Sequence, residues 1–147
     1  GYVPQGTPLL QELTAWDNLR LWYQPEALRR ELDQGVLRLL GIPEFLKTPV
    51  NRMSGGMKKR LSIGCAVASD PQILLLDEPC AALDLVCKEH ILEYLRLHKR
   101  RGGIILLATH DIQELSICSA CYMLRDGVAE AYDYTGDVQR LVGDLQL

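Results

Sequence analysis

No apolar stretch of this 147-residue chain approaches the roughly 20 residues that a membrane-spanning helix requires. The longest apolar runs are short and lie at 73–76 and 104–108. The chain also does not open with a basic segment followed by an apolar one, so we expect no signal peptide. Any link to a membrane is therefore expected to run through a partner protein.

The chain has no excess of positive charge. Its formal net charge is −3, so it lacks the basic surplus with which nucleic-acid-binding proteins neutralise phosphates. Hydrophobic residues make up 48% of the chain and charged residues 24%, which excludes disorder and is ordinary for a domain with a core. We expect a folded domain that does not bind nucleic acid.

A disulfide framework is missing as well. The chain has five cysteines, an odd number, and most of them lie within apolar segments. This pattern predicts reduced, buried thiols rather than pairs. Cys118 and Cys121 form a C-x-x-C, but neither a second pair nor a suitably spaced histidine completes a metal site. The isolated pair is a weak signal for a metal or redox function.

The first part of the chain, from about 8 to 70, has helical spacing. Thr14 and Asp17 match a capping box at a helix start. A proline opens the segment 25–40, and apolar residues at three- and four-residue steps predict one continuous helix there. A further helix is expected over 54–69, with a serine as its N-cap.

From residue 72 onward, short apolar strands alternate with helices. Strands are predicted at 73–76 and 104–108, with a helix between them. Two more strands, 121–124 and 128–132, flank an Asp-Gly turn signal at 126–127 and predict a hairpin. The alternation indicates an α/β fold whose parallel sheet is covered by helices on both faces.

Two adjacent carboxylates follow the first of these strands. Asp77 and Glu78 emerge at its carboxyl end, where open α/β sheets bind ligands. Because neighbouring residues at a strand end point in different directions, they can take different roles. Asp77 can hold a hydrated Mg²⁺, and Glu78 can orient and deprotonate a water. The alternative is an acidic turn that only caps the next helix.

Two further patterns point to a phosphate ligand. Ser54, Gly55 and Gly56 open a predicted helix and expose backbone N–H groups that can bind an anion, although a plain N-cap is the alternative. His110 follows an apolar strand and is expected at the same sheet edge as the two carboxylates. A lone histidine in such a place is more often structural than catalytic, but its predicted neighbours favour a functional role.

Together these motifs resemble the catalytic blocks of ABC-type ATPases. They are, in chain order, Gln5 at the Q-loop position, the signature Ser54-Gly55-Gly56, the strand end Asp77-Glu78, the D-loop Ala82-Leu83-Asp84 and the switch histidine His110. The resemblance covers nearly the whole chain, and five motifs in order are far more specific than any one alone. It implies a P-loop NTPase-like α/β core, incomplete here. Residues 1–70 would form the Q-loop and a helical signature subdomain, and 71–147 a RecA-like catalytic half-core.

The resemblance implies a role for each residue at the strand ends. Asp77 would anchor Mg²⁺, and Glu78 would act as the general base. Gln5 would contact the metal and the attacking water and signal to the membrane partner. His110 would sense the γ-phosphate of ATP. The implied cofactors are therefore ATP and Mg²⁺.

A second group of residues would act between subunits. The resemblance implies that Ser54, Gly55 and Gly56 bind the γ-phosphate of ATP held by the opposite subunit, and that Asp84 communicates across the dimer. The implied partners are a second ATPase subunit and transmembrane permease subunits. The implied location is the cytoplasmic side of the plasma membrane.

The implied function is the ATP-hydrolysing subunit of a transporter. Chromosome-organising relatives insert long coiled coils between Gln5 and Ser54, and the short stretch here argues for a transporter. Met57 stands where many members have glutamine, and its surrounding run resembles bacterial multidrug and antibiotic exporters, so export is expected. A soluble ABC-type ATPase acting on ribosomes or DNA, and a truncated non-enzymatic module, are the alternatives.

The phosphate-binding loop of such an ATPase is missing from the sequence. No G-x-x-x-x-G-K-[ST] occurs, and none of the lysines directly follows a glycine. We expect that loop to lie before residue 1 and the chain alone to hydrolyse little or no ATP. In this family the strand of that loop lies beside the strand 104–108. We therefore expect an exposed sheet edge through which the chain self-associates.

Overall fold

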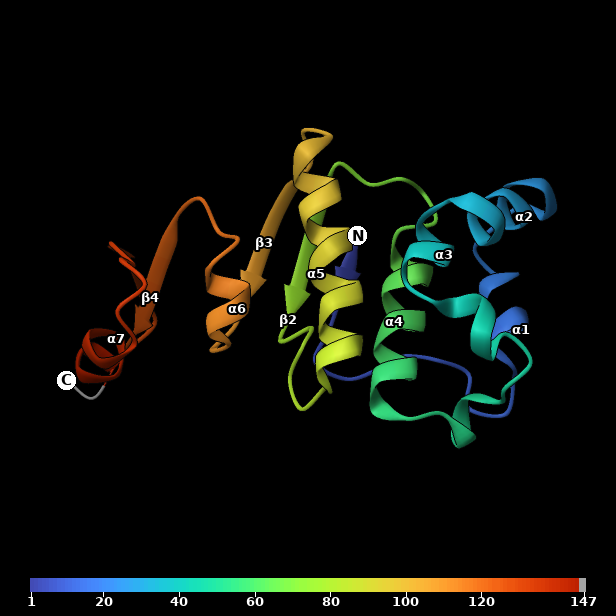
Figure 1. Cartoon of the computed structure of the whole chain (residues 1–147), viewed down its shortest axis with the longest axis horizontal. Coiled ribbons are helices and arrows are strands. Elements are labelled where there is room, and N and C mark those ends of the chain that lie inside the picture. Colours follow the sequence, from blue (N-terminus) through green and yellow to red (C-terminus); the bar gives the residue numbers. More distant parts are fainter. Residues whose placement is uncertain (146–147) are drawn as a thin grey trace. The chain divides into compact units, whose positions relative to one another are not determined.

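The computed structural model describes residues 1–145, which fall into two compact units, Gly1–Ala108 and a second that begins at Thr109 (Figure 1). In chain order the first unit contains β1 (Tyr2–Val3), α1 (Ala15–Leu19), α2 (Pro25–Gln34), α3 (Val36–Leu39), the 3₁₀ turns η1 (Ile42–Phe45) and η2 (Val50–Arg52), α4 (Gly55–Ala66), β2 (Ile73–Asp77), α5 (Leu85–Arg100) and β3 (Ile104–Ala108). The second contains α6 (Ile112–Leu115), β4 (Cys121–Arg125), β5 (Val128–Tyr132) and α7 (Val138–Leu145).

The helical part of the first unit begins as predicted. Thr14 and Asp17 form the expected capping box: the Asp17 N–H donates to Thr14 Oγ1 at 3.2 Å, and the Thr14 N–H donates to Asp17 Oδ2 at 3.4 Å. Pro25 stands at the first position of α2, where its missing N–H costs nothing. Leucines from α1, α2 and α3, such as Leu19 and Leu28, are fully buried and form the core of this part.

The predicted continuous helix over 25–40 is wrong, because the chain breaks at Gly35. That glycine is extended, with φ −104° and ψ −156°, and separates α2 from α3. The carboxylate of Glu31 accepts a hydrogen bond from the Val36 N–H at 2.9 Å, so it caps the new helix start. Apolar spacing predicts which residues face the core, and it continues in phase across such a break.

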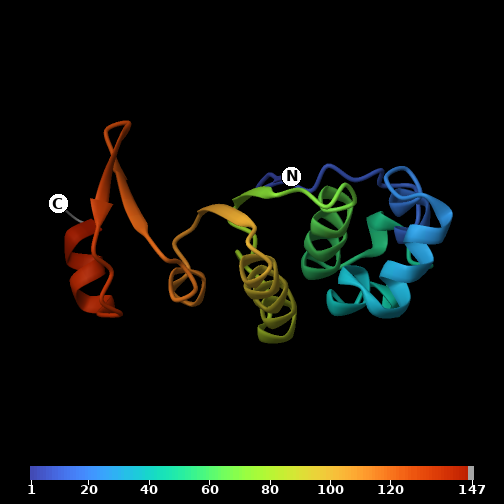
Figure 2. The ribbon, with the colours of Figure 1, turned by 90° about the horizontal axis from the view of Figure 1, so that it is seen from above.

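The core of the first unit also contains a three-stranded parallel sheet in the order β1-β2-β3. Figure 2 shows α4 (green) and α5 (yellow) on one side of the strands. Leu74 and Leu76 of β2 point to that side and are buried. In register, Leu75 lies beside Tyr2 and Leu106, so the three strands alternate between the two faces together.

The opposite face of this sheet is exposed. Its large apolar side chains are between 40% and 66% exposed, and they are Tyr2, Ile73, Leu75, Ile104 and Leu106. Within residues 1–108, the helices cover only one face of the sheet, in place of the predicted two. The physical reason is that the helices packed on the sheet in this unit, α4 and α5, share the other face.

Helix α4 lies between the helical part and the sheet and is buried on nearly every side. Leu61 and Ile63 are fully buried although they do not share one helical face. The hydroxyl of Tyr23 donates to the Gly64 carbonyl at 2.7 Å, and burial raises the pKa of Tyr23 well above its usual value. The helix ends at Ala66, three residues before the predicted end.

The second unit contains the predicted hairpin. Strands β4 and β5 pair antiparallel up to Arg125 and Val128, and the two residues between them, Asp126 and Gly127, have φ of 48° and 80°. Positive φ at both positions is the requirement of the tight turn that the Asp-Gly pair predicts. Among residues 1–145, no helix is long and apolar enough to span a membrane.

Substituting Gly64 tests the packing around α4. A Cβ at Gly64 would lie 2.8 Å from Ile42 Cδ1 and 2.8 Å from Leu37 Cδ2. We expect Gly64→Ala to lower the free energy of unfolding by about 1–2 kcal/mol, because overpacking outweighs the gain in helix propensity. Urea denaturation measures the change. Gly55→Ala is the matched control in the same helix, since nothing lies within 4 Å of its Cβ. Equal stability of the two variants would contradict the prediction.

Candidate functional site

The loop after β1 and the end of β2 meet at the carboxyl ends of the strands, which form one edge of the sheet. Because β1 runs parallel to β2, with Val3 beside Leu76, the residues that follow each strand emerge at the same edge. Nε2 of Gln5 donates to Oε2 of Glu78 at 3.3 Å. The structure thus brings together two predicted site residues that are 73 positions apart in the chain.

The backbone changes conformation between Asp77 and Glu78. Asp77 is the last residue of β2 and lies in register with Ala108. The Glu78 N–H still donates to the Ala108 carbonyl at 2.9 Å, but its φ is 44°, in the left-handed region. That conformation costs a non-glycine residue about 1–2 kcal/mol. It turns the chain out of the strand direction directly after Asp77.

The donors at this edge fit a metal ion that is bound together with a nucleotide. They are two half-buried carboxylates, Asp77 and Glu78, and the exposed amide of Gln5. Among the described residues, no group of three or more acidic, histidine or cysteine side chains could hold a metal ion by itself. Mg²⁺ commonly takes one or two protein carboxylates and completes its shell with phosphates and water. The set therefore suits Mg²⁺–ATP rather than a free ion.

The two glycines that open α4 differ in their surroundings. The Met57 N–H donates to Ser54 Oγ at 3.2 Å, so Ser54 is the predicted N-cap. Nothing lies within 4 Å of a Cβ on Gly55, which leaves the approach to the helix N-terminus open to a ligand. A Cβ on Gly56 would instead lie 2.5 Å from Cys87 Sγ. Gly55 provides access, and Gly56 permits close packing against α5.

The start of α5 lies beside the start of α4. Asp84 is the N-cap of α5, and its Oδ1 accepts a hydrogen bond from the Cys87 N–H at 2.9 Å. This bond holds the pKa of Asp84 below its ordinary value of 3.8. Its Oδ2 lies 3.9 Å from the Cβ position of Gly56. The predicted signature and D-loop residues therefore form a second cluster.

A comparison with models of protein families identifies the family that has these motifs. Residues 1–81, which include Gln5, the two glycines that open α4, Asp77 and Glu78, match the model described as ABC transporter. The chain belongs to the ABC transporter family. The resemblance seen in the sequence is thereby confirmed.

Curated ABC relatives include proteins named for import and for export. The chain is 38% identical to the molybdenum import ATP-binding protein ModC of Haemophilus influenzae, over 90% of this chain and 38% of that protein. It is 32% identical to the linearmycin resistance ATP-binding protein LnrL of Bacillus subtilis, over 98% and 48%. It is 37% identical to the Nod factor export ATP-binding protein I of Sinorhizobium fredii, over 86% and 38%. The chain thus spans less than half the length of these relatives.

Solved structures agree with the family. The ATP-binding cassette MJ0796, in a dimeric post-hydrolysis state bound to ADP and Pi, matches with a TM-score of 0.76 and 29% identity, over 91% of this chain and 63% of that one. An ATP-binding subunit of an ABC transporter matches with a TM-score of 0.78 and 29% identity, over 97% and 61%. The predicted P-loop NTPase-like fold class is therefore confirmed.

His110, the switch histidine of the family pattern, lies in the second unit. It follows β3 and precedes the N-cap of α6, Asp111, whose Oδ1 accepts a hydrogen bond from the Gln113 N–H at 2.8 Å. The sheet edge with Glu78 belongs to the first unit. The predicted place of His110 beside the carboxylates stays a prediction.

The thiols have the buried character that the sequence predicts. Cys65, Cys80 and Cys87 are buried thiols, and burial raises the pKa of Cys65 to about 12. Cys118 and Cys121 are half-buried thiols. Within residues 1–145 neither belongs to a group that could hold a metal ion.

Sequence reasoning missed two residues of this region, Lys59 and Cys87. Lys59 is only 5% exposed, and its Nζ donates to the loop that carries Gln5. Cys87 packs against Gly56. The sequence contained a signal for the burial of Lys59. The apolar residues of α4 lie on all sides of the helix instead of forming one stripe, which is typical of a helix that is buried on all sides.

The Asp84 cap predicts a pH dependence of stability. Because the folded-state pKa of Asp84 is lowered, its contribution is fully present above the ordinary pKa and is lost as pH falls through the folded value. Urea denaturation at several values between about pH 6 and pH 3 measures this loss. We expect Asp84→Asn, which keeps an acceptor for the Cys87 N–H, to lose less unfolding free energy with acidification than the wild type. Identical pH profiles would contradict the assignment.

Proposed function

We propose that this chain is part of the ATP-binding subunit of an ABC transporter and that its strand-end residues hydrolyse ATP. The observation that carries the proposal is the 3.3 Å hydrogen bond between Gln5 and Glu78. In the family pattern these are the Q-loop glutamine and the general base. Their contact supports this assignment, because the general base and the group that orients the attacking water must both lie within hydrogen-bonding distance of that water.

The strand end supplies a base and a metal-anchoring carboxylate. Asp77 would hold Mg²⁺, and Gln5 would contact both the metal and the attacking water. Bound Mg²⁺ would neutralise charge on the phosphates of ATP. Glu78 would take the proton of the water that attacks the γ-phosphate, while the Gln5 amide holds that water in line. We also propose that His110 senses the γ-phosphate.

The second cluster would act across a dimer. We propose that Ser54, Gly55 and Gly56 bind the γ-phosphate of ATP held by a second ATPase subunit. The open space at Gly55 and the free N–H groups at the start of the twelve-residue helix α4 support this role. Asp84, beside Gly56, would pass the state of one site to the other subunit.

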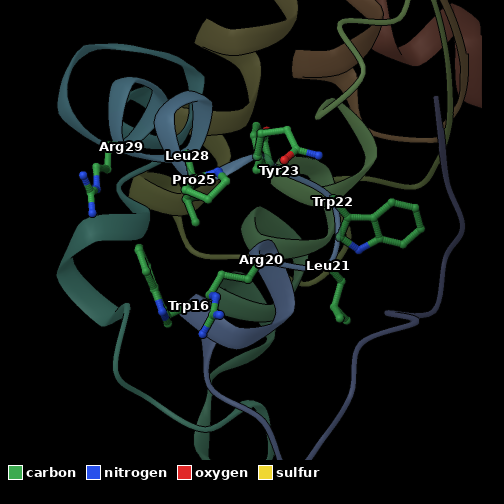
Figure 3. Close-up of a pocket in the computed structure, with 9 residues that line it drawn as sticks. Trp16, Arg20, Leu21, Trp22, Tyr23, Pro25, Leu28 and Arg29 are labelled. Atoms are coloured by element: carbon green, nitrogen blue, oxygen red, sulfur yellow. The ribbon is translucent and has the colours of Figure 1, made fainter.

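A pocket of about 260 Å³ at the corner of α1 and α2 supports contact with transmembrane permease subunits. Figure 3 shows Trp16, Arg20 and Arg29 around it, while Trp22 points away from them. Leu21 and Trp22 are 60% and 64% exposed. Exposed aromatic and aliphatic side chains beside arginines are typical of interface anchors. We therefore propose attachment to a permease at the cytoplasmic face of the plasma membrane.

The direction of transport and the internal division are finer proposals. Met57 within the signature run favours export, and relatives named for export and for import both match the chain. The division into a Q-loop and signature part, 1–70, and a catalytic half-core, 71–147, also stays a proposal.

Nucleotide assays test the proposed function. We expect the 147-residue chain to bind and hydrolyse little or no ATP with Mg²⁺, because it contains no lysine-bearing phosphate loop and positioning dominates phosphoryl-transfer catalysis. The same chain extended by an upstream phosphate loop should bind ATP in calorimetry and hydrolyse it. Glu78→Gln in the extended protein should lower kcat by about 100-fold or more while binding persists.

Turnover by the 147-residue chain that Glu78→Gln abolishes would contradict the expected inactivity of this chain without a phosphate loop. An extended chain that binds ATP but keeps its turnover in the Glu78→Gln variant would contradict the proposed function.

The exposed sheet edge predicts self-association of the 147-residue chain. Ile104 and Leu106 are exposed on β3, the last strand of its sheet among the described residues. We expect concentration-dependent dimers or larger species in light scattering, and Leu106→Asp should reduce them because a charge on an edge strand discourages pairing. Leu85→Asp, at a residue 75% exposed on α5, is the control. A clean monomer at high concentration would contradict the prediction.

A further inference from the structure

Lys59 donates its ammonium to two consecutive backbone carbonyls of the loop after β1. Nζ lies 3.0 Å from the Pro4 oxygen and 3.0 Å from the Gln5 oxygen. Only 5% of Lys59 is exposed. A buried ammonium requires such acceptors, because taking an unpaired charge out of water is costly. The two bonds therefore fix the path of the backbone at Pro4 and Gln5.

The preceding residue provides an internal contrast. Lys58 is half-buried, and its side chain makes no hydrogen bond or ion pair to any described residue. Both lysines lie in the second turn of α4 and have the same chemistry. The difference between them is where the helix points each side chain, so Lys58 is a matched control for Lys59.

Lys59 connects the two site clusters. It belongs to the helix that begins with Ser54, Gly55 and Gly56. It also donates a hydrogen bond to the backbone of Gln5, whose side chain contacts Glu78. A shift of α4 along the sheet edge would therefore move the Gln5 backbone or break two charge-assisted hydrogen bonds. One side chain thus links the phosphate-binding helix end to the strand-end carboxylates.

We propose that Lys59 is a positioning residue, which holds the Gln5 loop at the distance from α4 that keeps the Gln5 amide on Glu78. The inference rests on the proposed function for its catalytic consequence, but not for its structural one. Lys59 does not touch the reacting atoms. It acts by limiting the positions of Gln5, and small misplacements of an orienting group lower the rate of a chemical step strongly.

The structural consequence is measured on the 147-residue chain without nucleotide. We expect Lys59→Met to raise hydrogen–deuterium exchange of the amides around Gln5 by about tenfold or more. It should also shift the NMR signal of the Gln5 side-chain amide, which is identified by its loss in Gln5→Ala. Lys58→Met should change neither. Lys59→Arg, which keeps a cation with several donors, should restore both towards wild type.

The catalytic consequence is measured on the chain extended by a phosphate loop. We expect Lys59→Met to lower kcat about tenfold with the KM for ATP within about twofold, because Gln5 acts on the attacking water. Lys59→Arg should recover most of the loss. A general structural defect in Lys59→Met would instead alter hydrogen–deuterium exchange throughout α5. Lys59→Arg would then have to restore that exchange as well as kcat.

Unchanged exchange and an unchanged Gln5 amide signal in Lys59→Met would overturn the proposal, as would an equal effect of Lys58→Met. If Lys59→Met does not fold, Lys59→Arg and Lys59→Gln carry the same test, with glutamine expected to fail and arginine to succeed. An extended wild-type chain that hydrolyses no ATP would refute the proposed function, and the exchange and NMR measurements would still decide the role of Lys59.

Discussion

The burial of α4 is the constraint on which the rest of the first unit depends. Two cationic side chains of this helix are buried away from water, so each requires hydrogen-bond acceptors within the protein. Lys59 finds them in the loop after β1. Arg60, 6% exposed, donates to the Leu40 carbonyl at 3.0 Å and lies 3.2 Å from His90 Nδ1. Because a guanidinium has only donors, the His90 nitrogen must be the acceptor. The helix is thereby tied to the loop, to the end of α3 and to α5.

These ties explain how residues far apart in the chain reach one region. The parallel pairing of β1 with β2 brings Gln5 to the strand end, and the close approach of α4 to α5 brings Gly56 to Asp84. The approach depends on the absence of a side chain at Gly56, since a Cβ there would meet a sulfur at 2.5 Å. Gly55, one residue earlier, meets nothing. Of two adjacent glycines, one therefore permits close packing and the other leaves open space at the start of the helix.

Much of this arrangement could be predicted from local chemistry. The Thr14–Asp17 capping box, the Asp-Gly hairpin and the strand that ends at Asp77 each depend on residues close in sequence, and each formed where expected. The break at Gly35 could not be predicted, because the apolar spacing runs through it and the Glu31 carboxylate stabilises the new helix start. The acceptors of Lys59 were equally hidden, since they are backbone oxygens more than 50 positions away. Burial of a lysine is visible only after the helix has been packed.

The exposed sheet face shows a different limit. In β2, the outward residues Ile73 and Leu75 are as apolar as the inward Leu74 and Leu76, so the pattern predicts cover on both sides. The described helices of the first unit supply one layer. Ile73 and Leu75 remain 50% and 40% exposed, so each misses roughly half of the 1.5–3 kcal/mol that complete burial of such a side chain yields. The apolar residues on both faces of a strand indicate that both faces are suited to burial. They do not indicate which segment of the protein covers each face. The loop that carries Gln5 is accordingly held from the covered side of the sheet, where Lys59 of α4 donates to its backbone, and this is why Lys59 matters to the Gln5–Glu78 contact.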